Sequence, residues 1–386
     1  MLVPKLRFKR EDGTDYPEWE QTCVGKVFDK VKDKNKDCSN TNVITNSAEF
    51  GLISQRDFFD KDIAVEGKTD NYTIIKTNDF VYNPRKSSFA PFGAFNGYTL
   101  ADDGIVSPLY FCLRMKNNKM SANFMLWYFK SSRWHRFIYE NGEQGGARHD
   151  RVGISEEMVK GIPIDKPCLE EQQKIAAFLS AVDEVIAQSE AEVQNLEQQK
   201  KAAMQKIFSQ EVRFKREDGT EYPEWEEKRV GEILTLCHGK DYKHLEKGDI
   251  PVMGTGGVIT YVNEALCDWQ CVCIGRKGTI DRPYFMDKPF WSVDTLFYSK
   301  PVSDNMPKFQ YYLFQNINWQ LYNEASGVPS LSASTIENVK VKVPDIEEQQ
   351  KIADFLSAYD EAISYAKQEL DKWKELKKGL LQQMFV

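Results

Sequence analysis

Residues 170–186 read EEQQKIAAFLSAVDEVI, and residues 347–363 read EEQQKIADFLSAYDEAI, so fourteen of seventeen positions match. Neither Pro nor Gly occurs between Glu170 and Phe208, which favours one long helix. Apolar or small residues recur in steps of four and three, and this period of 3.5 residues is typical of a coiled coil. The stripe comprises Ile175, Leu179, Val182, Ile186, Ser189, Val193, Leu196, Ala203 and Ile207 in the first copy, and Ile352, Leu356, Tyr359, Ile363, Ala366, Leu370, Trp373, Leu380 and Met384 in the second.

The two stripes share one register, including a lysine, Lys200 or Lys377, in place of one apolar residue. We predict two helices of ~39 residues, each ~58 Å long at ~1.5 Å per residue, that pair as an antiparallel coiled coil. Two separate amphipathic core helices are the alternative, but about four to five heptads without a cap exceed an ordinary globular helix. Both copies carry an Asp-Glu step off the stripe, at Asp183 and Asp360. We expect this step on a solvated face, where it serves solubility or a partner.

A second repeated pair precedes these helices. Residues 7–20 read RFKREDGTDYPEWE and residues 213–226 read RFKREDGTEYPEWE, which differ at one position of fourteen. The sequences between the repeats, 21–169 and 228–346, look largely unrelated. Simple drift after a duplication does not easily leave near-identity at the edges and wholesale change between them. The pattern indicates that the repeated segments do one job twice, such as meeting two copies of one partner, while the variable segments do different jobs.

The variable segments each look like a compact α+β domain. Short strand-like runs alternate with turn signals, and each segment contains one aromatic helical stretch, 123–138 or 308–322. The predicted fold is therefore α+β, with two globular domains separated by two long helices in an antiparallel coiled coil and a pseudo-twofold internal repeat. The segments are 1–20, the N-terminal repeat segment; 21–169, the first domain; 170–208, the central helix; 209–227, the repeat linker; 228–346, the second domain; and 347–386, the C-terminal helix.

The chain of 386 residues has a formal net charge of −7, which at first argues against nucleic acid as a partner. However, residues 21–169 hold 21 Lys and Arg against 18 Asp and Glu, and residues 228–346 hold 13 of each kind. The acidity therefore lies in the helices and linkers, whereas both variable domains are neutral to mildly basic. This distribution permits a local basic face for DNA. It also predicts weak non-specific DNA binding by the free chain, because phosphate contacts dominate that affinity.

Basic and polar residues interleave with aromatic residues in both domains. Arg and Lys can bind guanine edges or phosphates, and Ser and Thr can contact other base edges, although each one alone is more often a solvated surface residue. Glycines flank two clusters, because Gly275–Gly278 would form a basic tip between strands and Arg148–Arg151 follows two glycines in a loop. The candidate DNA-binding residues are Arg56, Tyr82, Arg85, Lys86, Arg148, His149 and Arg151 in the first domain, and Lys240, Tyr242, Lys243, His244, Thr255, Arg276, Lys277 and Ser330 in the second.

Sequence motifs for catalysis are absent. There is no GxxxxGK[ST] phosphate loop, no zinc-protease helix and no GxSxG nucleophile elbow. Cys267, Cys271 and Cys273 form the only cysteine cluster, but no CxxC pair or nearby histidine supports zinc, so we interpret Cys271–Ile274 as a half-buried strand. We therefore expect no catalytic residue, no metal and no cofactor in this chain.

No apolar run approaches the ~18 residues that a membrane span needs. The charged start of the chain, Met1–Arg10, is unlike a signal peptide. We expect a cytoplasmic location.

Taken together, these motifs closely resemble the specificity subunit of type I restriction–modification systems, over nearly the whole chain. The first domain departs from the family pattern, because it lacks a Gly-Arg-Lys-Gly run and has Gly145-Gly146-Ala147-Arg148 near its end. The carriers of the resemblance are EEQQKIAAFL at 170–179 and EEQQKIADFL at 347–356, each after a short strand and a proline, and the second-domain runs at 254–257, 274–280, 289–295 and 327–332.

The resemblance implies a subunit without catalysis of its own. Each domain would read one half of a split site in double-stranded DNA, and the helices would act as a ruler for half-sites about one helical turn, ~34–36 Å, apart. Two methyltransferase subunits would dock on the repeated helices, flip adenines and methylate N6 with S-adenosylmethionine, and two restriction subunits would use ATP and Mg. The alternative is a coiled-coil scaffold that bridges two identical protein partners and binds no DNA. A third alternative, an enzyme that acts on nucleic acid, has no motif in its favour.

Overall fold

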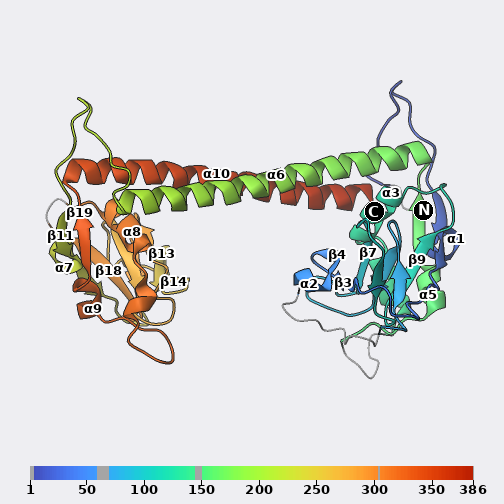
Figure 1. Cartoon of the computed structure of the whole chain (residues 1–386), viewed down its shortest axis with the longest axis horizontal. Coiled ribbons are helices and arrows are strands. Elements are labelled where there is room, and N and C mark those ends of the chain that lie inside the picture. Colours follow the sequence, from blue (N-terminus) through green and yellow to red (C-terminus); the bar gives the residue numbers. More distant parts are fainter. Residues whose placement is uncertain (1–3, 59–68, 144–149, 303–304, 386) are drawn as a thin grey trace. The chain divides into compact units, whose positions relative to one another are not determined.

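The computed structural model describes residues 4–58, 69–143, 150–302 and 305–385. Contacts divide the chain into two compact units, which we call the first unit (residues 1–188 with 370–386) and the second unit (residues 189–369). Each unit contains one repeat segment, one variable domain and parts of both long helices (Figure 1). These units cut across the linear segments predicted from sequence, because each long helix contributes its two ends to different units.

In the first unit, antiparallel strands form a four-stranded sheet in the order β2-β9-β6-β7 and three two-stranded sheets, β1-β10, β3-β4 and β5-β8. The aromatic helix α3 packs along β7. The elements are β1 Glu20–Cys23, α1 Val24–Val27, β2 Phe28–Lys30, β3 Ile44–Ser47, β4 Gly51–Ser54, α2 Gln55–Phe58, β5 Thr73–Ile75, β6 Phe80–Asn83, β7 Ala94–Gly97, β8 Gly104–Val106, β9 Phe111–Met115, α3 Ala122–Lys130, α4 His135–Asn141, α5 Glu156–Gly161 and β10 Pro163–Lys166.

In the second unit, the sheets are β12-β18-β15-β16, β14-β13-β17 and β11-β19. All strand pairs are antiparallel except β13 with β17, which is parallel. The elements are β11 Glu226–Arg229, α7 Val230–Ile233, β12 Leu234–His238, β13 Ile250–Gly254, β14 Gly257–Val262, β15 Cys271–Gly275, β16 Tyr284–Met286, β17 Trp291–Ser292, β18 Leu296–Pro301, α8 Pro307–Asn316, η1 Trp319–Tyr322, α9 Ala333–Glu337 and β19 Lys340–Val343.

The two variable domains share a topology that their sequences do not reveal. The order β2-β9-β6-β7 in the first matches β12-β18-β15-β16 in the second, and the pair β1-β10 matches β11-β19. Both domains also have an antiparallel hairpin, β3-β4 or β13-β14, beside this sheet. Residues at equivalent places in the two domains can therefore be compared from the strand order rather than from sequence identity.

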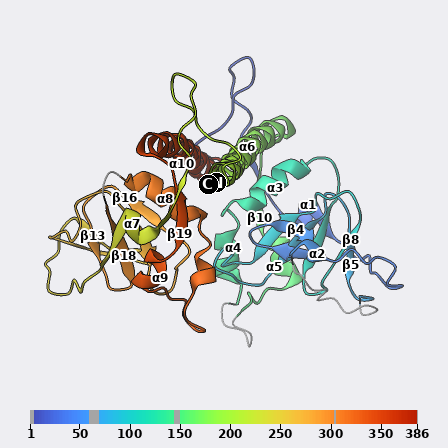
Figure 2. The same cartoon turned by 60° about the vertical axis from the view of Figure 1, so that its left-hand side comes forward.

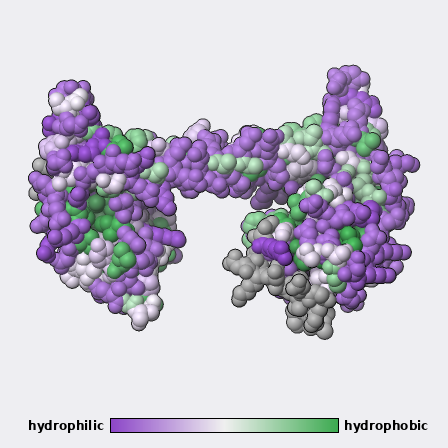
Figure 3. All heavy atoms as spheres, in the orientation of Figure 1, coloured by the Kyte–Doolittle hydropathy of each residue, from purple (hydrophilic) through white to green (hydrophobic). Residues whose placement is uncertain are grey.

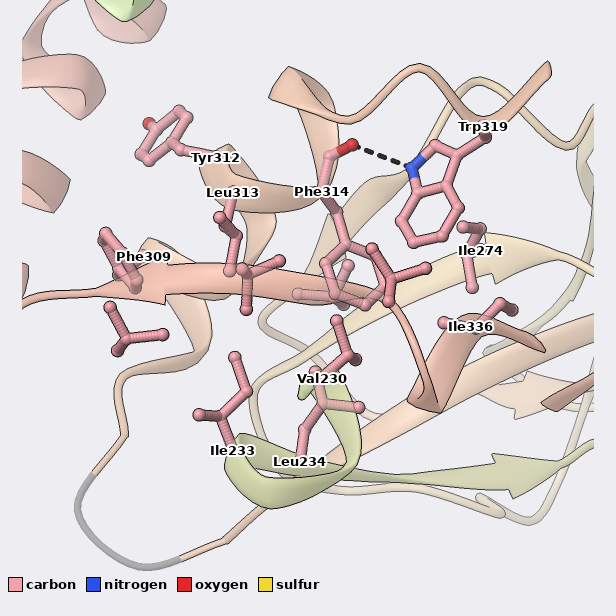
Figure 4. Close-up of a cluster of buried hydrophobic side chains, with 14 of the residues drawn as sticks. Val230, Ile233, Leu234, Ile274, Phe309, Tyr312, Leu313, Phe314, Trp319 and Ile336 are labelled. Atoms are coloured by element: carbon pink, nitrogen blue, oxygen red, sulfur yellow. Dashed lines mark hydrogen bonds between the residues drawn. The ribbon is translucent and has the colours of Figure 1, made fainter. Parts of the chain in front are cut away.

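In both domains the aromatic stretch breaks into two helices. The single helices predicted at 123–138 and 308–322 are α3 with α4 and α8 with η1. A buried tryptophan folds back at each break. The indole N–H of Trp134 donates to the carbonyl five residues earlier at 3.0 Å, and that of Trp319 does the same at 2.8 Å, as Figure 4 shows for Trp319. Each indole satisfies a carbonyl near the end of a helix and fills the core beside it, so the same arrangement ends both helices.

The two long helices have the predicted lengths: α6, Leu169–Phe208, has 40 residues and α10, Ile346–Met384, has 39. Among the described residues, no helix combines the length and apolar character needed to cross a membrane. The face of both helices drawn in Figure 3 is mainly hydrophilic, as expected for a narrow apolar stripe. The buried stripe residues are Ile175, Leu179, Val182, Ile186, Val193, Ile207, Ile352, Leu356, Ile363, Ala366, Leu370, Leu380 and Met384, while Leu196, Tyr359 and Trp373 are half-buried.

Within the second unit, the helices lie side by side and antiparallel. Glu197 pairs with Lys367 at 2.7 Å, and Lys200 pairs with Asp360 at 2.6 Å. From the first pair to the second the residue number increases along α6 and decreases along α10, so the two helices run in opposite directions.

Part of the stripe also serves the globular domain. Ile352 and Leu356 of α10, and Ile207 of α6, join the buried cluster around Val230 and Phe309 in the second unit. The sequence analysis assigns the stripe to helix pairing alone. The difference arises because the ends of the helices rest on the globular domain, and the same apolar face packs there.

Candidate nucleic-acid interface

In the first domain, a basic turn follows strand β6. The Asn83 side chain accepts the backbone N–H of Arg85 at 3.0 Å, which starts a tight turn. The turn then pairs with the loop before α5: Arg85 and Arg151 face each other in an antiparallel bridge, and the Lys86 N–H donates to the Asp150 carbonyl at 2.8 Å. Arg85 is exposed, with its Nε 3.6 Å from Asp150 Oδ2. Backbone pairing thus fixes two arginines next to each other.

The second domain builds the same turn after strand β15. Arg276 and Lys277 follow β15 directly, and both are exposed. Lys277 and Ser330 form an antiparallel bridge, and the Leu331 N–H donates to the Arg276 carbonyl at 2.9 Å. The Arg276 Nη1 donates to the Asp294 carbonyl at 3.3 Å. Three predicted DNA-binding residues, Arg276, Lys277 and Ser330, therefore lie together.

Thr255, in the turn between β13 and β14, lies beside this basic turn. A Cβ on Gly275 would lie 3.0 Å from Thr255 Cγ2, and a Cβ on Gly278 would lie 3.6 Å from Thr255 Oγ1. At Gly275 the same Cβ would also meet the Thr279 carbonyl at 2.1 Å, so a side chain does not fit there. Glycine at this position therefore lets the basic turn fold back close to its own backbone.

Strand order makes the two basic turns equivalent. Strands β6 and β15 both stand third in their four-stranded sheets, and each is followed by a basic pair that bridges to a later loop. In the bridge register, Arg85 is thus the counterpart of Lys277, and Arg151 is the counterpart of Ser330. The first domain has no Gly-Arg-Lys-Gly run, because residues 83–86, Asn-Pro-Arg-Lys, stand where the second domain has residues 275–278.

A helix-capping serine follows each bridged loop and could have shown from sequence that the two loops are equivalent. Ser155 accepts the Met158 N–H at 3.2 Å and begins α5, and Ser332 accepts the Thr335 N–H at 3.1 Å and begins α9. Serine is a preferred N-cap because its hydroxyl satisfies a free N–H of the first turn. Each capped helix follows its bridged loop within a few residues, so the cap marks the loop in both sequences.

A pocket of about 460 Å³, lined mostly by residues that carry a polar group, opens beside the first basic turn. Arg151 has a buried Nε that, within the described residues, meets no hydrogen-bond acceptor. Burial raises the pKa of Tyr110, so its hydroxyl stays protonated at neutral pH. The pocket therefore presents donors to a ligand that offers acceptors, such as a base edge or a phosphate. Its lining residues are Thr45, Asn46, Ser47, Ala48, Asn83, Arg85, Lys86, Ser87, Ala94, Ser107, Leu109, Tyr110 and Arg151.

The remaining predicted residues of the second domain lie along Trp291. The Lys240 N–H donates to a carbonyl of β17 at 2.7 Å, and Trp291 Nε1 donates to the Lys240 carbonyl at 2.9 Å. The His244 ring meets the Trp291 ring edge-on, with centroids 5.7 Å apart. Lys240, Lys243 and His244 are exposed, whereas Tyr242 is half-buried against a core cluster. Strand β17 leads into Asp294 and Thr295, whose backbone carbonyls accept hydrogen bonds from Arg276, so this chain segment connects the Lys240 group to the basic turn.

Several predicted contacts of the first domain are not part of this surface. Tyr82 is fully buried and its hydroxyl donates to the Phe92 carbonyl at 2.7 Å, so the prediction that it contacts DNA is wrong. Burial also raises its pKa. Phe80, Val81 and Tyr82 are all buried, so both faces of β6 lie in the core and no side chain of these three can reach a DNA surface. Arg56 lines a different, smaller pocket, and Arg148 and His149 lie outside the described residues.

Cys271 and Cys273 lie in a strand, as predicted, but the strand is buried on both faces rather than half-buried, and Cys267 lies outside it. Cys271 and Cys273 are fully buried in β15, and Cys267 Sγ lies 3.9 Å from Cys271 Sγ. The hydrogen bond with the Cys271 thiol and then burial raise the pKa of Cys267. Among residues 4–58, 69–143, 150–302 and 305–385, no group of three His, Cys, Asp or Glu side chains is placed to hold a metal ion.

The repeated sequences contact each other within each unit. In the first unit Glu171 is buried and accepts from Arg7 Nη2 at 2.8 Å and from Trp19 Nε1 at 3.0 Å. In the second unit Arg213 and Trp225 make the same bonds, at 2.8 and 3.0 Å, to the equivalent glutamate. The hydrogen bonds that each arginine donates to its glutamate carboxylate raise the pKa of that arginine. These buried contacts, which we call the anchor of each unit, therefore explain much of the sequence identity between the repeats. From the sequence alone, that identity is interpreted as a surface that binds two copies of one partner.

Beyond this anchor, the repeat segments form two exposed hairpins. We call residues 7–19 and 213–225 the repeat hairpins; each closes through one bridge and turns at a glycine with positive φ, Gly13 at 82° and Gly219 at 84°. Asp12 and Asp218 accept from the N–H and hydroxyl two residues later, at 2.9 and 2.6 Å in both copies. Within each unit the hairpin rises from the helices on the side away from the globular domain (Figures 1 and 2).

The repeated aspartates pair with the lysines of the stripe. Asp183 lies 2.5 Å from Lys377, and Asp360 lies 2.6 Å from Lys200. The expectation of a solvated face is therefore wrong for these aspartates, which are about one-third exposed, because the other helix brings a lysine to each.

An aromatic residue of each globular domain joins the corresponding lysine–aspartate pair. Lys377 Nζ is 5.4 Å from the Trp127 ring, and Lys200 Nζ is 5.1 Å from the Tyr312 ring. These aromatic residues also hydrogen-bond equivalent serines, Ser180 and Ser357, at 3.2 and 3.1 Å. The same contact thus attaches each domain to both helices.

Comparison with known proteins identifies the class to which this fold and surface belong. The chain matches the family model of the type I restriction modification DNA specificity domain at residues 16–198 and again at residues 222–374. Because these matches cover most of the sequence, the chain belongs to this family. The two matched ranges correspond to the two copies of the repeated unit, and the comparisons give no support to the scaffold alternative.

Individual relatives agree with this assignment. The chain is 21% identical to the type I restriction enzyme MjaVIII specificity subunit of Methanocaldococcus jannaschii, over 97% of this chain and 94% of that protein. It is also 21% identical to a putative type I specificity subunit of Mycoplasma pneumoniae, over 80% of this chain and 77% of that protein.

Solved structures confirm the predicted fold. The S subunit of a type I restriction–modification system from M. genitalium superposes with a TM-score of 0.61 at 18% identity, covering 100% of this chain and 99% of that one. A chain from another type I system gives a TM-score of 0.59 at 14% identity, covering 96% and 98%. The α+β architecture with two domains and long helices is therefore shared well beyond recognisable sequence identity.

Proposed function

We propose that this chain is the DNA sequence-specificity subunit of a type I restriction–modification complex and that it reads a split site in double-stranded DNA. One block is read by the first domain and the other by the second. The single observation that carries the proposal is the basic turn that occurs twice, at Arg85-Lys86 and at Arg276-Lys277, each bridged to a loop of different sequence. One backbone frame with two sets of side chains suits a protein that must recognise two different blocks.

The long helices would fix the gap between the two blocks. Each is about 60 Å long at ~1.5 Å per residue, and each attaches both of its ends to globular domains through buried contacts such as those of Lys200 and Lys377. A continuous helix is stiff over this length, so its residue count would set the spacing.

Two methyltransferase subunits would dock on the repeated surfaces. The exposed stretch KREDGT is identical in both repeat hairpins, and the anchors at Glu171 and Glu348 hold it in the same conformation. Asp12, Gly13 and Thr14 form the turn itself, but the repeated Lys9 and Glu11 are exposed, and docking of two copies of one partner would account for their identity. The partners would flip adenines and methylate N6 with S-adenosylmethionine, and restriction subunits would supply ATP- and Mg-dependent cleavage. This chain would carry no catalytic residue and bind none of these cofactors.

The proposal is tested by co-expressing the chain with its neighbouring methyltransferase and mapping N6-methyladenine across the host DNA by single-molecule sequencing. We expect one split motif, two short blocks with a fixed unspecified gap. Exchange of residues 21–169 for another such domain should change one block only. A stable protein complex that neither methylates nor binds a split motif would contradict the proposal.

Docking is tested separately by the number of methyltransferases bound. Reversing the charges of Lys9, Arg10 and Asp12 in the first repeat hairpin should lower the ratio from two methyltransferases per chain to one. The same change at Lys215, Arg216 and Asp218 should remove the other copy. Native mass spectrometry measures this ratio, and an unchanged ratio in the double variant would place docking elsewhere.

A further inference from the structure

The outer part of strand β14 carries apolar side chains that cover no core. Val258, Ile259 and Tyr261 are 51, 53 and 52% exposed. Only at its base does the strand become buried, where Val262 joins a cluster with Val252. The strand order β14-β13-β17 places β14 at the edge of its sheet. The register places Val258 opposite Met253 and Tyr261 opposite Pro251, so both lie on one face of the ribbon, and the buried Val262 and Val252 lie on the other.

The shape of the tip suits close approach to another molecule. The register places Val258 opposite Met253 and Thr260 opposite Val252, so Ile259 is the extra residue of a β-bulge. Such bulges re-aim a side chain and are common beside binding sites. At the turn, a Cβ on Gly256 or on the next glycine would meet nothing within 4 Å, so the tip is narrow and open.

The surroundings of the tip favour nucleic acid over an apolar protein surface. Thr255, the residue before the two tip glycines, lies against Gly275 and Gly278, which flank the exposed Arg276 and Lys277. The apolar ribbon is therefore continuous with the cationic turn that the proposed function assigns to DNA. A protein partner of low polarity would have to desolvate both cations without a counter-charge, which is costly, whereas DNA offers phosphates to them and methyl groups to the ribbon.

We infer that the β13–β14 ribbon enters the DNA major groove and that Val258 and Ile259, with Tyr261 behind them, read thymine by its methyl group. This inference rests on the proposed function and names residues that neither the sequence motifs nor the basic turn indicate. The major groove, ~12 Å wide, admits a two-stranded ribbon, and the C5 methyl of thymine is the apolar group that it displays. The bulged Ile259 presents a branched side chain of the right chemistry at the ribbon surface.

The equivalent hairpin of the first domain is built differently. In β3-β4, Leu52 is buried and Ile53 is half-buried, and the adjoining pocket is lined by polar side chains such as Asn46 and Arg151. Thymine reading by an apolar ribbon is therefore specific to the block that the second domain recognises, and this gives the experiment an internal control.

The test measures binding of the complex of this chain with its methyltransferase to duplexes that carry deoxyuridine in place of thymidine. Deoxyuridine pairs identically but lacks the methyl group. At one or more positions of the second domain's block we expect about fourfold weaker binding for each methyl removed, the size expected for one buried methyl group. The Ile259→Ser variant should bind thymidine and deoxyuridine duplexes equally at that position. The Leu321→Ser variant, which alters another exposed apolar residue of the same domain, should keep the full response.

The outcomes separate this inference from the proposed function. Loss of all site-specific binding by the wild-type complex would overturn the proposed function itself. Specific binding with no deoxyuridine effect in the second block, or a second block without any thymine, would overturn the ribbon inference alone. A deoxyuridine effect that persists in both Val258→Ser and Ile259→Ser would assign the methyl contact to other residues and also overturn it. Binding of the wild-type complex to the deoxyuridine duplexes tests whether thymine methyl groups are read, even if a variant fails to fold.

Discussion

The two basic turns have the same backbone and different surroundings. In the first domain, Arg85 and Arg151 border a pocket of hydrogen-bonding side chains. In the second, Arg276 and Lys277 adjoin an exposed apolar ribbon. The bridge that fixes each turn uses only backbone atoms, so it does not restrict the side chains that the turn and its loop display. Specificity can therefore change at these positions without a change of fold.

The anchors at the other side of each unit behave in the opposite way. Glu171 and Glu348 are fully buried and hold an arginine and a tryptophan at nearly equal distances in both units. A buried carboxylate needs every one of these partners, because an unpaired charge in the interior is expensive. The residue types at the anchors are thus constrained by a buried charge. Those at the basic turns can vary, because only backbone atoms form the bridge that fixes each turn.

The largest expected effect on stability comes from removing the buried carboxylate of either anchor. Glu171→Ala and Glu348→Ala should each destabilise their own unit by about 3 kcal/mol, because an arginine and an indole N–H lose their buried acceptor. Urea unfolding with hydrogen exchange of the peptides in each unit measures the loss. The neighbouring Glu170→Ala is the matched control: its side chain is 60% exposed, lies 4.0 Å from Arg10 and accepts from the Tyr16 hydroxyl at 3.1 Å, so we expect a loss of about 1 kcal/mol at most. Unequal losses in the two units would end the claim that the anchors are equivalent.

The next effect sharpens the difference between the two turns. Arg276→Ala with Lys277→Ala should weaken recognition of the second domain's block by about 1–3 kcal/mol per lost base contact, and Arg85→Ala with Arg151→Ala should do the same for the other block. The N6-methyladenine motif of each variant complex is the measurement, and one block should become degenerate while the other is unchanged. Equal relaxation of both blocks in either variant would mean that the turns contact only phosphates.

Sequence predicts the repeated framework of this protein well, because local rules govern it. The heptad stripe led to α6 and α10 within a few residues, since period and absence of breakers are properties of a single segment. The Cys271–Ile274 strand followed for the same reason. The shared topology of the variable domains did not follow, because strand order depends on contacts between distant segments that carry no common motif.

The candidate site was predicted in part. Arg276, Lys277 and Ser330 were named together because a glycine-flanked basic run marks a turn, and the backbone bridge brings them together. Tyr82 was misplaced because its neighbours Arg85 and Lys86 suggested a surface, whereas its own strand position puts the ring inside. The pairing of Asp183 with Lys377 joins residues nearly two hundred positions apart. Only the antiparallel register of the two helices reveals such a pair.

A smaller effect tests whether these lysines join domain and helices equally in both units. Replacing Lys200 or Lys377 by Met keeps the stem but removes the charge, and we expect losses of about 1 kcal/mol. The Lys200 side chain is 12% exposed and that of Lys377 is 27% exposed, so the loss should be greater for Lys200. A double-mutant cycle of Lys200→Met with Asp360→Asn, measured by urea unfolding at low and high salt, isolates the pair. A coupling energy near zero would show that packing alone attaches the domain.

The smallest effect concerns the helices that follow the two recognition loops. Hydrogen bonds from Lys160 and then Lys30 lower the pKa of Glu156, at the start of α5, to about 2 from an ordinary 4.5. A lowered pKa means that the folded state favours the charged form. The contribution is therefore complete above pH 4.5 and is lost as the pH falls towards 2. Because the side chain is one-third exposed, the contribution should be only about 0.5 kcal/mol.

Glu156→Gln should remove this pH dependence from hydrogen exchange in α5. In the second domain, hydrogen bonds from Thr335 and Ser332 lower the pKa of the exposed Glu324 before α9, so Glu324→Gln is the parallel variant. Its carboxylate accepts from the hydroxyls of Ser332 and Thr335 and from the Ser332 N–H, all at the start of α9, whereas Glu156 reaches Lys30 on strand β2. Acid should therefore loosen the attachment of α5 to its sheet more than that of α9. An equal acid response of the two helices would show that the local cap, rather than the ion pair across to the strand, holds each recognition loop in place.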